Sequence, residues 1–219
     1  IILASAVALV PACRPGRRAR ARRLSRARAR ARPRARTRTA IMTAALTVWA
    51  RDFTAALSDI AERAEVSRST LHRYFPERQD LVDAVLLDSL QTIDTIARAA
   101  DDGTRSPLDH LIYLLRSFVE VADNVVFLFT DPARFTGNPH WGDTGDASLR
   151  PLIAAAQADG ALDPDLPTEW VEGIFNAHLY VAATTAQQAN VPKHVIADNA
   201  IRTFLGGVAT RRPAADEAR

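Results

Sequence analysis

The sequence of 219 residues predicts an all-α protein, and three observations carry this prediction. Apolar residues recur at three- and four-residue spacing over most of the chain after Ala40, as they do on one face of a helix. No stretch alternates apolar and polar residues for long enough to predict a β-strand. Helix start signals, such as the serine and proline at Ser106 and Pro107, separate the periodic segments.

The composition excludes several classes of protein. An apolar fraction of 47% is ordinary for a globular protein and excludes disorder of the whole chain. The longest apolar run, Ile1–Ala12, is shorter than the roughly 20 residues of a membrane-spanning helix, so we expect no membrane partner. The single cysteine, Cys13, excludes an internal disulfide and a Cys-x-x-Cys pair, which favours a reducing cytoplasm.

The charge is distributed unevenly along the chain. The first forty residues hold thirteen arginines and no acidic residue, whereas residues 41–219 carry a formal charge of −10. A basic arm on an acidic body favours a polyanionic partner that binds at one end of the chain. We expect residues 1–33 to be either a disordered arginine-rich arm or translated upstream sequence from a wrongly assigned start.

The first predicted elements are three short helices. An apolar face that includes Ile41, Val48 and Trp49 predicts a helix over Arg38–Asp52. A second and a third helix follow at Leu57–Ala64 and Ser67–Tyr74, with only two residues between them. Two short helices joined by such a tight turn have the spacing of a helix-turn-helix.

The remaining elements are longer. A long amphipathic helix is predicted to begin near Leu81, and another helix at Ser106, which is placed to cap it. The later segments are a short apolar stretch at 124–135, a loop at 137–145, and helices at 147–158, 167–189 and 192–205, the last closed by Gly206 and Gly207. The expected domains are 34–80 and 81–210, followed by a disordered tail at 211–219.

One segment closely resembles a known family signature. Residues 60–78, IAERAEVSRSTLHRYFPER, resemble the DNA-binding signature of the tetracycline-repressor (TetR) family of bacterial regulators, and the likeness extends over about 38–85. The resemblance implies a transcriptional regulator of the repressor type that acts in the bacterial cytoplasm at the nucleoid. It also implies a homodimer that binds a palindromic operator in double-stranded DNA and is released by a small apolar or aromatic effector.

The third helix carries the predicted DNA contacts. Ser67 can cap this helix and direct its positive N-terminal end at a groove or a phosphate. Leu71 faces the second helix, which leaves Arg68 and Arg73 outward, where arginine can bind guanine or a phosphate. With the positions that the resemblance implies, the predicted DNA-binding residues are Arg34, Arg36, Arg38, Ser67, Arg68, Ser69, Thr70, His72, Arg73, Tyr74 and Arg78.

The segment departs from the family pattern at three places. Glu65 stands where the family has a glycine in a left-handed conformation, and a non-glycine residue there should cost about 1 kcal/mol. Ala56 stands where a serine or threonine cap is common. His72 and Tyr74 are exchanged relative to the commoner order, although both can still donate to a phosphate.

The rest of the chain resembles the family's effector-binding and dimerisation domain in its helical plan. Helices of a bundle commonly enclose a pocket for an apolar ligand. The candidate lining residues are Phe118, Phe127, Phe129, Trp141, Trp170, Phe175 and His178, and the alternative for each is ordinary core packing. The last two helices are expected to form the dimer interface.

The sequence contains no recognisable catalytic motif. It lacks the glycine-rich phosphate loops and the Gly-x-Ser-x-Gly and His-Glu-x-x-His patterns. We therefore expect no enzymatic activity, no cofactor and no metal site. The alternative function is that of an architectural DNA- or RNA-binding protein driven by the arginine-rich arm.

Overall fold

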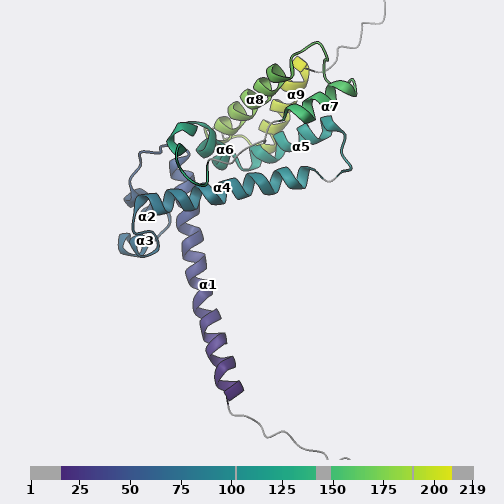
Figure 1. Cartoon of the computed structure of the whole chain (residues 1–219). Coiled ribbons are helices and arrows are strands. Elements are labelled where there is room, and N and C mark those ends of the chain that lie inside the picture. Colours follow the sequence, from purple (N-terminus) through teal and green to yellow (C-terminus); the bar gives the residue numbers. More distant parts are fainter. Residues whose placement is uncertain (1–15, 102, 142–148, 189, 209–219) are drawn as a thin grey trace, which may run out of the picture. The chain divides into compact units, whose positions relative to one another are not determined.

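The computed structural model describes residues 16–101, 103–141, 149–188 and 190–208, and side chains from Pro33 onward (Figure 1). These residues form α-helices and one 3-10 turn but no β-strand, which confirms the all-α prediction for the part of the chain described. The elements are α1 (Gly16–Trp49), α2 (Leu57–Arg63), α3 (Arg68–Tyr74), α4 (Arg78–Ala100), α5 (Pro107–Glu120), α6 (Ala122–Phe129), η1 (Pro132–Phe135), α7 (Arg150–Ala158), α8 (Thr168–Gln188) and α9 (Lys193–Val208).

Helix α1 is longer than the sequence predicted. Residues 1–33 were expected to be a disordered arm or translated upstream sequence; residues 1–15 lie outside the described part, and the backbone from Gly16 onward is helical. Alternating arginine and alanine explain this difference, because both are strong helix formers. Pro33, which lacks a backbone N–H, lies inside the helix.

The described chain divides into two compact units. Residues up to Ala40 cluster separately from those that begin at Ile41, and the second unit contains both the helix-turn-helix and the helical bundle. Helix α4 begins at Arg78 and runs unbroken past residue 80, so the boundary between 34–80 and 81–210 stays a prediction. The predicted tail at 211–219 lies outside the described residues.

The second unit has one continuous apolar core. It joins Ile41 and Trp49 of α1, Leu81 of α4 and the inner faces of the later helices. Among the described residues, the buried polar side chains are Ser89 of α4 and Asn124 of α6. The Asn124 amide donates to the Ser89 hydroxyl at 3.1 Å, so neither group is left without a partner in the core.

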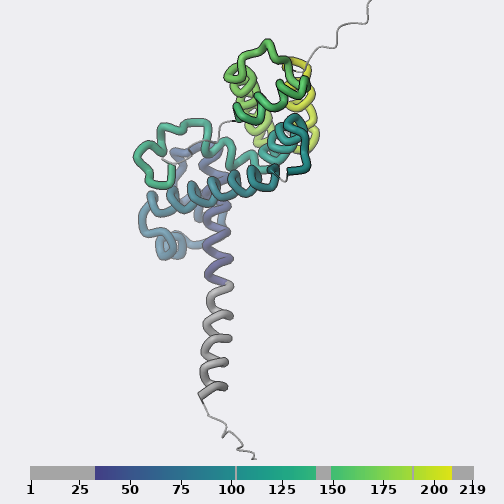
Figure 2. The backbone as a smooth tube through the Cα atoms, turned by 45° about the vertical axis from the view of Figure 1, so that its right-hand side comes forward, coloured from purple at the N-terminus to yellow at the C-terminus, as the bar shows by residue number. Residues whose placement is uncertain are grey.

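The bundle brings together helices that are far apart in the sequence. Helix α5 packs against α9, α7, α8 and α4, and α8 packs against α6 and α9 (Figures 1 and 2). In Figure 2 the C-terminal helix, in yellow, lies beside the teal segment that contains α5. This arrangement surrounds α5 with other helices and leaves one face of α8 and α9 on the surface.

Several helix ends differ from the predictions. Helix α9 passes through Gly206 and Gly207 and ends at Val208, because Val208 is buried and its carbonyl accepts from the Asp163 N–H at 2.9 Å. Tertiary packing here outweighs the low helix propensity of glycine. The apolar stretch 124–135 divides into α6 and η1, with Pro132 at the start of the second. Ser106 caps α5 as predicted, accepting from the Asp109 N–H at 3.1 Å.

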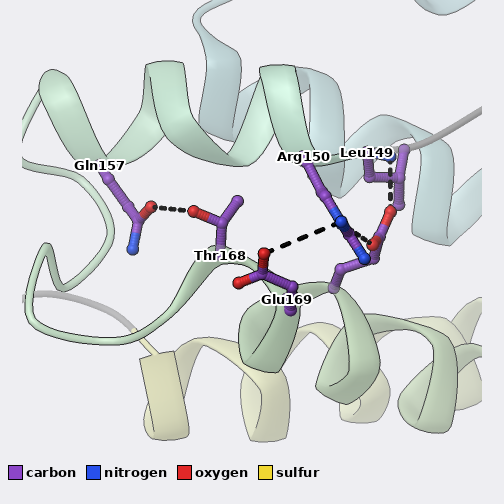
Figure 3. Close-up of polar contacts among 6 residues, drawn as sticks. Leu149, Arg150, Gln157, Thr168 and Glu169 are labelled. Atoms are coloured by element: carbon purple, nitrogen blue, oxygen red, sulfur yellow. Dashed lines mark hydrogen bonds and ion pairs between the residues drawn. The ribbon is translucent and has the colours of Figure 1, made fainter.

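Polar contacts fasten α7 to α8 (Figure 3). Arg150 donates to Glu172 at 2.8 Å and lies 3.8 Å from the Glu169 carboxylate (Figure 3). The Thr168 hydroxyl donates to the Gln157 amide oxygen at 3.4 Å (Figure 3). No helix among the described residues is both long enough and apolar enough to cross a membrane.

Candidate nucleic-acid interface and ligand cavity

A tight turn joins α2 to α3. Glu65 has a φ of +54°, which confirms the left-handed conformation expected at this position. The turn is closed by backbone hydrogen bonds from Glu65 to Glu62 and from Val66 to Ala61, both 3.0 Å long. Since a left-handed residue reverses the chain sharply, α3 can begin at Arg68, only a few residues after α2 ends.

Hydroxyl groups gather at the start of α3. Ser67 caps the helix as predicted, and its side chain accepts from the Thr70 N–H at 3.1 Å. Its hydroxyl also lies 2.9 Å from that of Thr70 and 3.0 Å from that of Ser69. These groups are polar and lie at a helix N-terminus, where backbone N–H groups and the helix dipole favour a phosphate.

The outer face of α3 carries the polar residues that the sequence predicted there. Ser67, Arg68, Ser69, His72 and Arg73 are exposed, and Thr70 and Tyr74 are half-buried. Leu71 and Phe75 are buried against the core.

Aromatic and backbone contacts hold two of the residues on this helix. The Arg73 guanidinium lies 5.7 Å from the Tyr74 ring centroid, and the His72 Nδ1 atom lies 3.4 Å from the Pro76 carbonyl oxygen. Both side chains are exposed, and their contacts with DNA remain predictions.

Arg78 has a structural role that the sequence analysis did not foresee. Its guanidinium donates to the Ala55 carbonyl at 2.7 Å and to the Phe53 carbonyl, and it stacks over Trp49 at 4.7 Å. The side chain therefore fixes the segment between α1 and α2 to the first turn of α4. The Arg78 side chain is half-buried, and its contact with a DNA phosphate remains a prediction.

Three of the residues predicted to bind DNA lie on α1, in the first compact unit. Arg34, Arg36 and Arg38 are exposed on the helix. The Thr37 hydroxyl donates to the Pro33 carbonyl at 3.0 Å, at the turn where proline leaves that helix without its usual N–H. The three arginines thus lie on a helical segment and not on the extended arm that disorder would imply.

The bundle encloses a cavity of about 930 Å³. Its walls come from α4, α5, α6, α7 and α8 and from Trp141 in the segment after η1. The lining residues are Leu90, Ile93, Ala97, Asp101, His110, Leu114, Phe118, Val125, Leu128, Phe129, Trp141, Leu149, Pro151, Leu152, Glu172, Phe175, Asn176, Leu179 and Tyr180. The cavity is therefore mainly apolar, with a few polar groups.

The charged groups of the cavity lining are acidic. Asp101 and Glu172 contribute carboxylates, and no lysine or arginine is among the described lining residues. Glu172 accepts from the Leu149 N–H and from the Arg150 side chain, both at 2.8 Å. The hydrogen bond to Glu172 raises the pKa of Arg150, so this pair holds the start of α7 against α8 at the cavity wall.

The structure brings together only part of the predicted pocket. Phe118, Phe129, Trp141 and Phe175 line the cavity. Phe127 does not, because its ring packs on Phe135 at 5.3 Å and on Phe53 at 6.1 Å instead of facing the cavity.

The other two candidates lie elsewhere. Trp170 is 60% exposed on the surface of α8. His178 belongs to a different groove, and its Nδ1 atom lies 2.8 Å from the Ile174 carbonyl oxygen of its own helix.

Sequence reasoning missed the aliphatic side chains that form much of the cavity wall. Leu90, Ile93 and Ala97 share one face of α4, and Leu114 lies on α5 beside Phe118. The sequence carried a signal for Leu90 and Ile93, because they continue the apolar stripe that starts at Leu81 and are only partly buried against the core. The predicted pocket contained only aromatic residues and a histidine, and so it left out these aliphatic residues.

A second hollow of about 540 Å³ lies between α8 and α9. Several large apolar side chains are exposed on these two helices or between them, including Tyr180 at 41%, Val181 at 62% and Val195 at 37%. Exposed apolar patches of this kind mark surfaces that bind a partner. This is the face on which the sequence analysis placed the dimer interface.

Comparisons with known proteins agree with this arrangement. The family model described as bacterial regulatory proteins, tetR family, matches residues 41–85. The HTH-type transcriptional repressor LfrR of Mycolicibacterium smegmatis is 33% identical over 174 residues, which cover 78% of this chain and 89% of that protein.

Solved structures share the fold. The TetR-like regulator LfrR from Mycobacterium smegmatis in complex with proflavine has a TM-score of 0.63 and 29% identity, and covers 80% of this chain and 97% of its own. The ketosteroid regulator KstR2 of Mycobacterium tuberculosis has a TM-score of 0.65 at 18% identity, and covers 80% and 95% of the two chains, which shows the common fold alone. Together with the helix-turn-helix geometry, the similarity to LfrR shows that this chain belongs to the TetR family of DNA-binding transcriptional regulators.

Proposed function

We propose that this TetR-family protein is a repressor that binds a palindromic operator as a homodimer and leaves it when a small aromatic molecule fills the bundle cavity. The observation that carries the proposal is the geometry of α3, whose outer face holds Arg68, Ser69, His72 and Arg73 while Leu71 anchors its inner face. A bacterial protein with this function acts on the chromosome in the cytoplasm, near the nucleoid.

The start of α3 supports the DNA-binding part of the proposal. The hydroxyls of Ser67, Ser69 and Thr70 and the N-terminal backbone can bind phosphates and set the register on DNA. Arg68 and Arg73 are both exposed on the outer face of α3, and an arginine that enters the major groove can bind guanine bidentately.

The exposed face of α8 and α9 supports a homodimer. Val181 and Val191 are large, apolar and exposed, and both line the hollow between the two helices. A twofold interface repeats one patch on both subunits, so a single self-complementary face suffices. A twofold dimer in turn presents two recognition helices to two half-sites, which explains why a palindromic operator is expected.

The cavity supports a planar aromatic effector. Its volume of about 930 Å³ is within the range of small-molecule sites, and its walls offer aromatic rings such as Phe118 and Phe175. The related regulator LfrR has been solved in complex with proflavine, a ligand that would suit these walls. The Glu172 carboxylate is paired with Arg150, so the cavity favours a neutral aromatic molecule, and Asp101 offers a carboxylate to a ligand that carries a positive charge.

The test of DNA binding begins with selection of a binding site from random DNA by the full-length protein. Arg68→Ala and Arg73→Ala should each weaken binding to the selected site by about 1–3 kcal/mol where the arginine reads a base. Arg98→Ala is a matched control, because Arg98 is exposed on α4 and pairs with Asp94 within the same helix. Equal affinities of the wild type and both recognition-helix variants would disprove the assignment of α3 as the reading helix.

The helical arginine-rich segment supports a second candidate function, that of a protein driven onto nucleic acid by its arm. Removal of residues 1–38 should flatten the dependence of log K on log salt by roughly 0.9 for each phosphate that the shortened protein no longer binds. If the arm only adds affinity, the shortened protein keeps its preference for the selected site. Loss of that preference, with equal binding to RNA, would favour the architectural function over the repressor.

A further inference from the structure

A series of aromatic rings connects the cavity with the helix-turn-helix. Trp141, which lines the cavity, lies 5.1 Å from Phe135, and Phe135 lies 5.3 Å from Phe127. Phe53, in the segment between α1 and α2, meets Phe135 edge-on at 6.4 Å and Phe127 at 6.1 Å. Phe53 then packs on Trp49, with ring centroids 5.6 Å apart. The contacts from the cavity to the helix-turn-helix therefore form a continuous series between aromatic rings.

Two arginines hold Phe53 in this series. The Arg134 guanidinium lies 4.4 Å from the centroid of the Phe53 ring, and its side chain is only 13% exposed. Its Nε atom donates to the Asp131 carbonyl at 2.9 Å, which fixes it to the start of η1. Arg78 donates to the Phe53 carbonyl and lies 5.5 Å from the ring centroid. Since Arg78 is the first residue of α4, the Phe53 ring is held between the segment after α6 and the helix that follows α3.

Asn138 makes a second, polar connection between the same two regions. Its side-chain amide donates to the Asp83 carboxylate of α4 at 2.7 Å. Its backbone N–H donates to the Phe135 carbonyl at 2.9 Å, and its carbonyl accepts from the Trp141 N–H at 3.0 Å. The backbone that positions Trp141 at the cavity is thus tied to the first turns of α4.

We propose that the segment Asp131–Trp141 is a coupling element that carries the state of the cavity to the helix-turn-helix through Phe53 and Asp83. The inference rests on the proposed function, since it requires both an effector and an operator. A ligand in the cavity packs against the Trp141 indole and displaces it or holds it in place. Because packed rings do not compress, a shift of Trp141 is passed to Phe135 and Phe53, and through Asn138 to α4.

The alternative route is α4 by itself. Leu90, Ile93 and Ala97 of this helix also line the cavity, and its first turn lies next to the helix-turn-helix. The two routes predict different effects of mutation. If α4 alone transmits the change, the contacts of Asn138 and Phe53 can be removed without effect on the coupling, which is the ratio of operator Kd with saturating ligand to operator Kd without it.

The experiment measures this coupling ratio with proflavine as the ligand and the DNA site selected by the wild-type protein. Coupling between two sites is typically about 5- to 150-fold. In Asn138→Ala and in Phe53→Leu the ratio should fall at least threefold, while the Kd for proflavine changes less than twofold. Gln79→Ala is the matched control, because Gln79 donates to the same Asp83 oxygen at 2.7 Å but belongs to α4 itself and not to the segment.

A second measurement needs no ligand. Binding of the selected DNA should slow hydrogen–deuterium exchange of residues 132–141 in the wild type and in Gln79→Ala, and leave it unchanged in Asn138→Ala, because the coupling is reciprocal. Unchanged coupling ratios in both variants, or equal protection of the segment in all three proteins, would overturn the proposal. If proflavine does not change the DNA affinity of the wild-type protein, the proposed effector is wrong. The hydrogen-exchange measurement then tests the coupling element without a ligand.

Discussion

Helices α3 and α6 are of similar length and are held in opposite ways. Of the seven residues of α3, only Leu71 is buried. Six of the eight residues of α6 are buried, namely Ala122, Asn124, Val125, Val126, Phe127 and Leu128. Helix α6 is packed on more than one side, by α8, α4 and α5, whereas α3 packs mainly on α2.

The contrast shows how the molecule divides stability and recognition. Helix α3 keeps most of its side chains free for a partner, and its position depends on Leu71, on the cap at Ser67 and on the turn at Glu65. Elements with few buried contacts open at lower free energy than the core. We therefore expect the helix-turn-helix to unfold locally before α6, which has no comparable free surface.

The largest expected effect tests this difference with one substitution at two places. Leu71→Ala and Leu115→Ala each remove a leucine that is 1% exposed, the first from α3 and the second from α5 beside α6. Leu71→Ala should lower the free energy of local opening of the helix-turn-helix, and Leu115→Ala the free energy of unfolding of the bundle, each by about 2–5 kcal/mol. Hydrogen exchange should show that Leu71→Ala opens residues 57–75 alone and abolishes DNA binding, while proflavine still binds.

Leu115→Ala should instead lower protection throughout the bundle, because its surroundings are packed from several sides. If α6 and α8 lose as much protection in Leu71→Ala as in Leu115→Ala, the helix-turn-helix and the bundle unfold as one unit. The difference between α3 and α6 would then be a difference in packing and not in stability.

The next effect concerns the cavity. Phe118→Ala should weaken proflavine binding by about 2 kcal/mol, the value of burying one large apolar side chain. Trp170→Ala is the control on the same domain, because Trp170 is 60% exposed and is not among the lining residues. Fluorescence titration of proflavine measures both. An equal loss in the two variants would show that the aromatic residues of the bundle affect the ligand only through general stability.

The two regions also differ in how far the sequence could predict them. The exposed face of α3 follows from a period of 3.6 residues and a local cap, so Arg68, Ser69, His72 and Arg73 could be placed outward from neighbours in the sequence alone. The all-helical fold followed from the same periodicity.

The cavity depends on which helices meet. Phe127 and Phe129 are two residues apart on α6 and so point to different faces, but which face meets the cavity depends on helices that are distant in the sequence. The role of Arg78 was likewise hidden, because its partners Phe53 and Ala55 lie more than twenty residues away. The helical backbone of the arginine-rich segment agrees with the high helix propensity of arginine and alanine, whereas the expectation of disorder followed from its density of positive charge.

A smaller effect is expected at the turn before α3. Glu65 adopts a φ of +54°, where glycine carries no penalty. Glu65→Gly should therefore raise the free energy of unfolding by about 1 kcal/mol, measured by urea titration. Glu62→Gly is the opposite control, because Glu62 lies inside α2, where glycine destabilises a helix. Equal effects of the two glycines would show that the turn is not under strain.

The smallest effect tests whether surface polar contacts add to the few apolar contacts that hold the helix-turn-helix. Asp52 accepts from the Thr54 hydroxyl at 2.6 Å and from the Thr54 N–H at 2.8 Å, and these bonds, with the charge of Arg78, lower the pKa of Asp52 below its ordinary 3.8. A carboxyl whose pKa is lowered by folding stabilises the fold above its unfolded pKa, and this contribution is lost as the pH falls through the folded value.

Asp52→Asn should therefore be slightly less stable than the wild type at pH 7 and equally so at pH 5, and the gap should close below about pH 4. Urea titrations at pH 7, 5, 4 and 3 measure the difference. In a Thr54→Ala background the gap should be smaller at every pH, because the hydroxyl that has the largest influence on the Asp52 pKa is gone. A gap that persists unchanged at pH 3 would mean that the carboxylate charge contributes nothing, and that the turn and the buried side chains alone hold the helix-turn-helix.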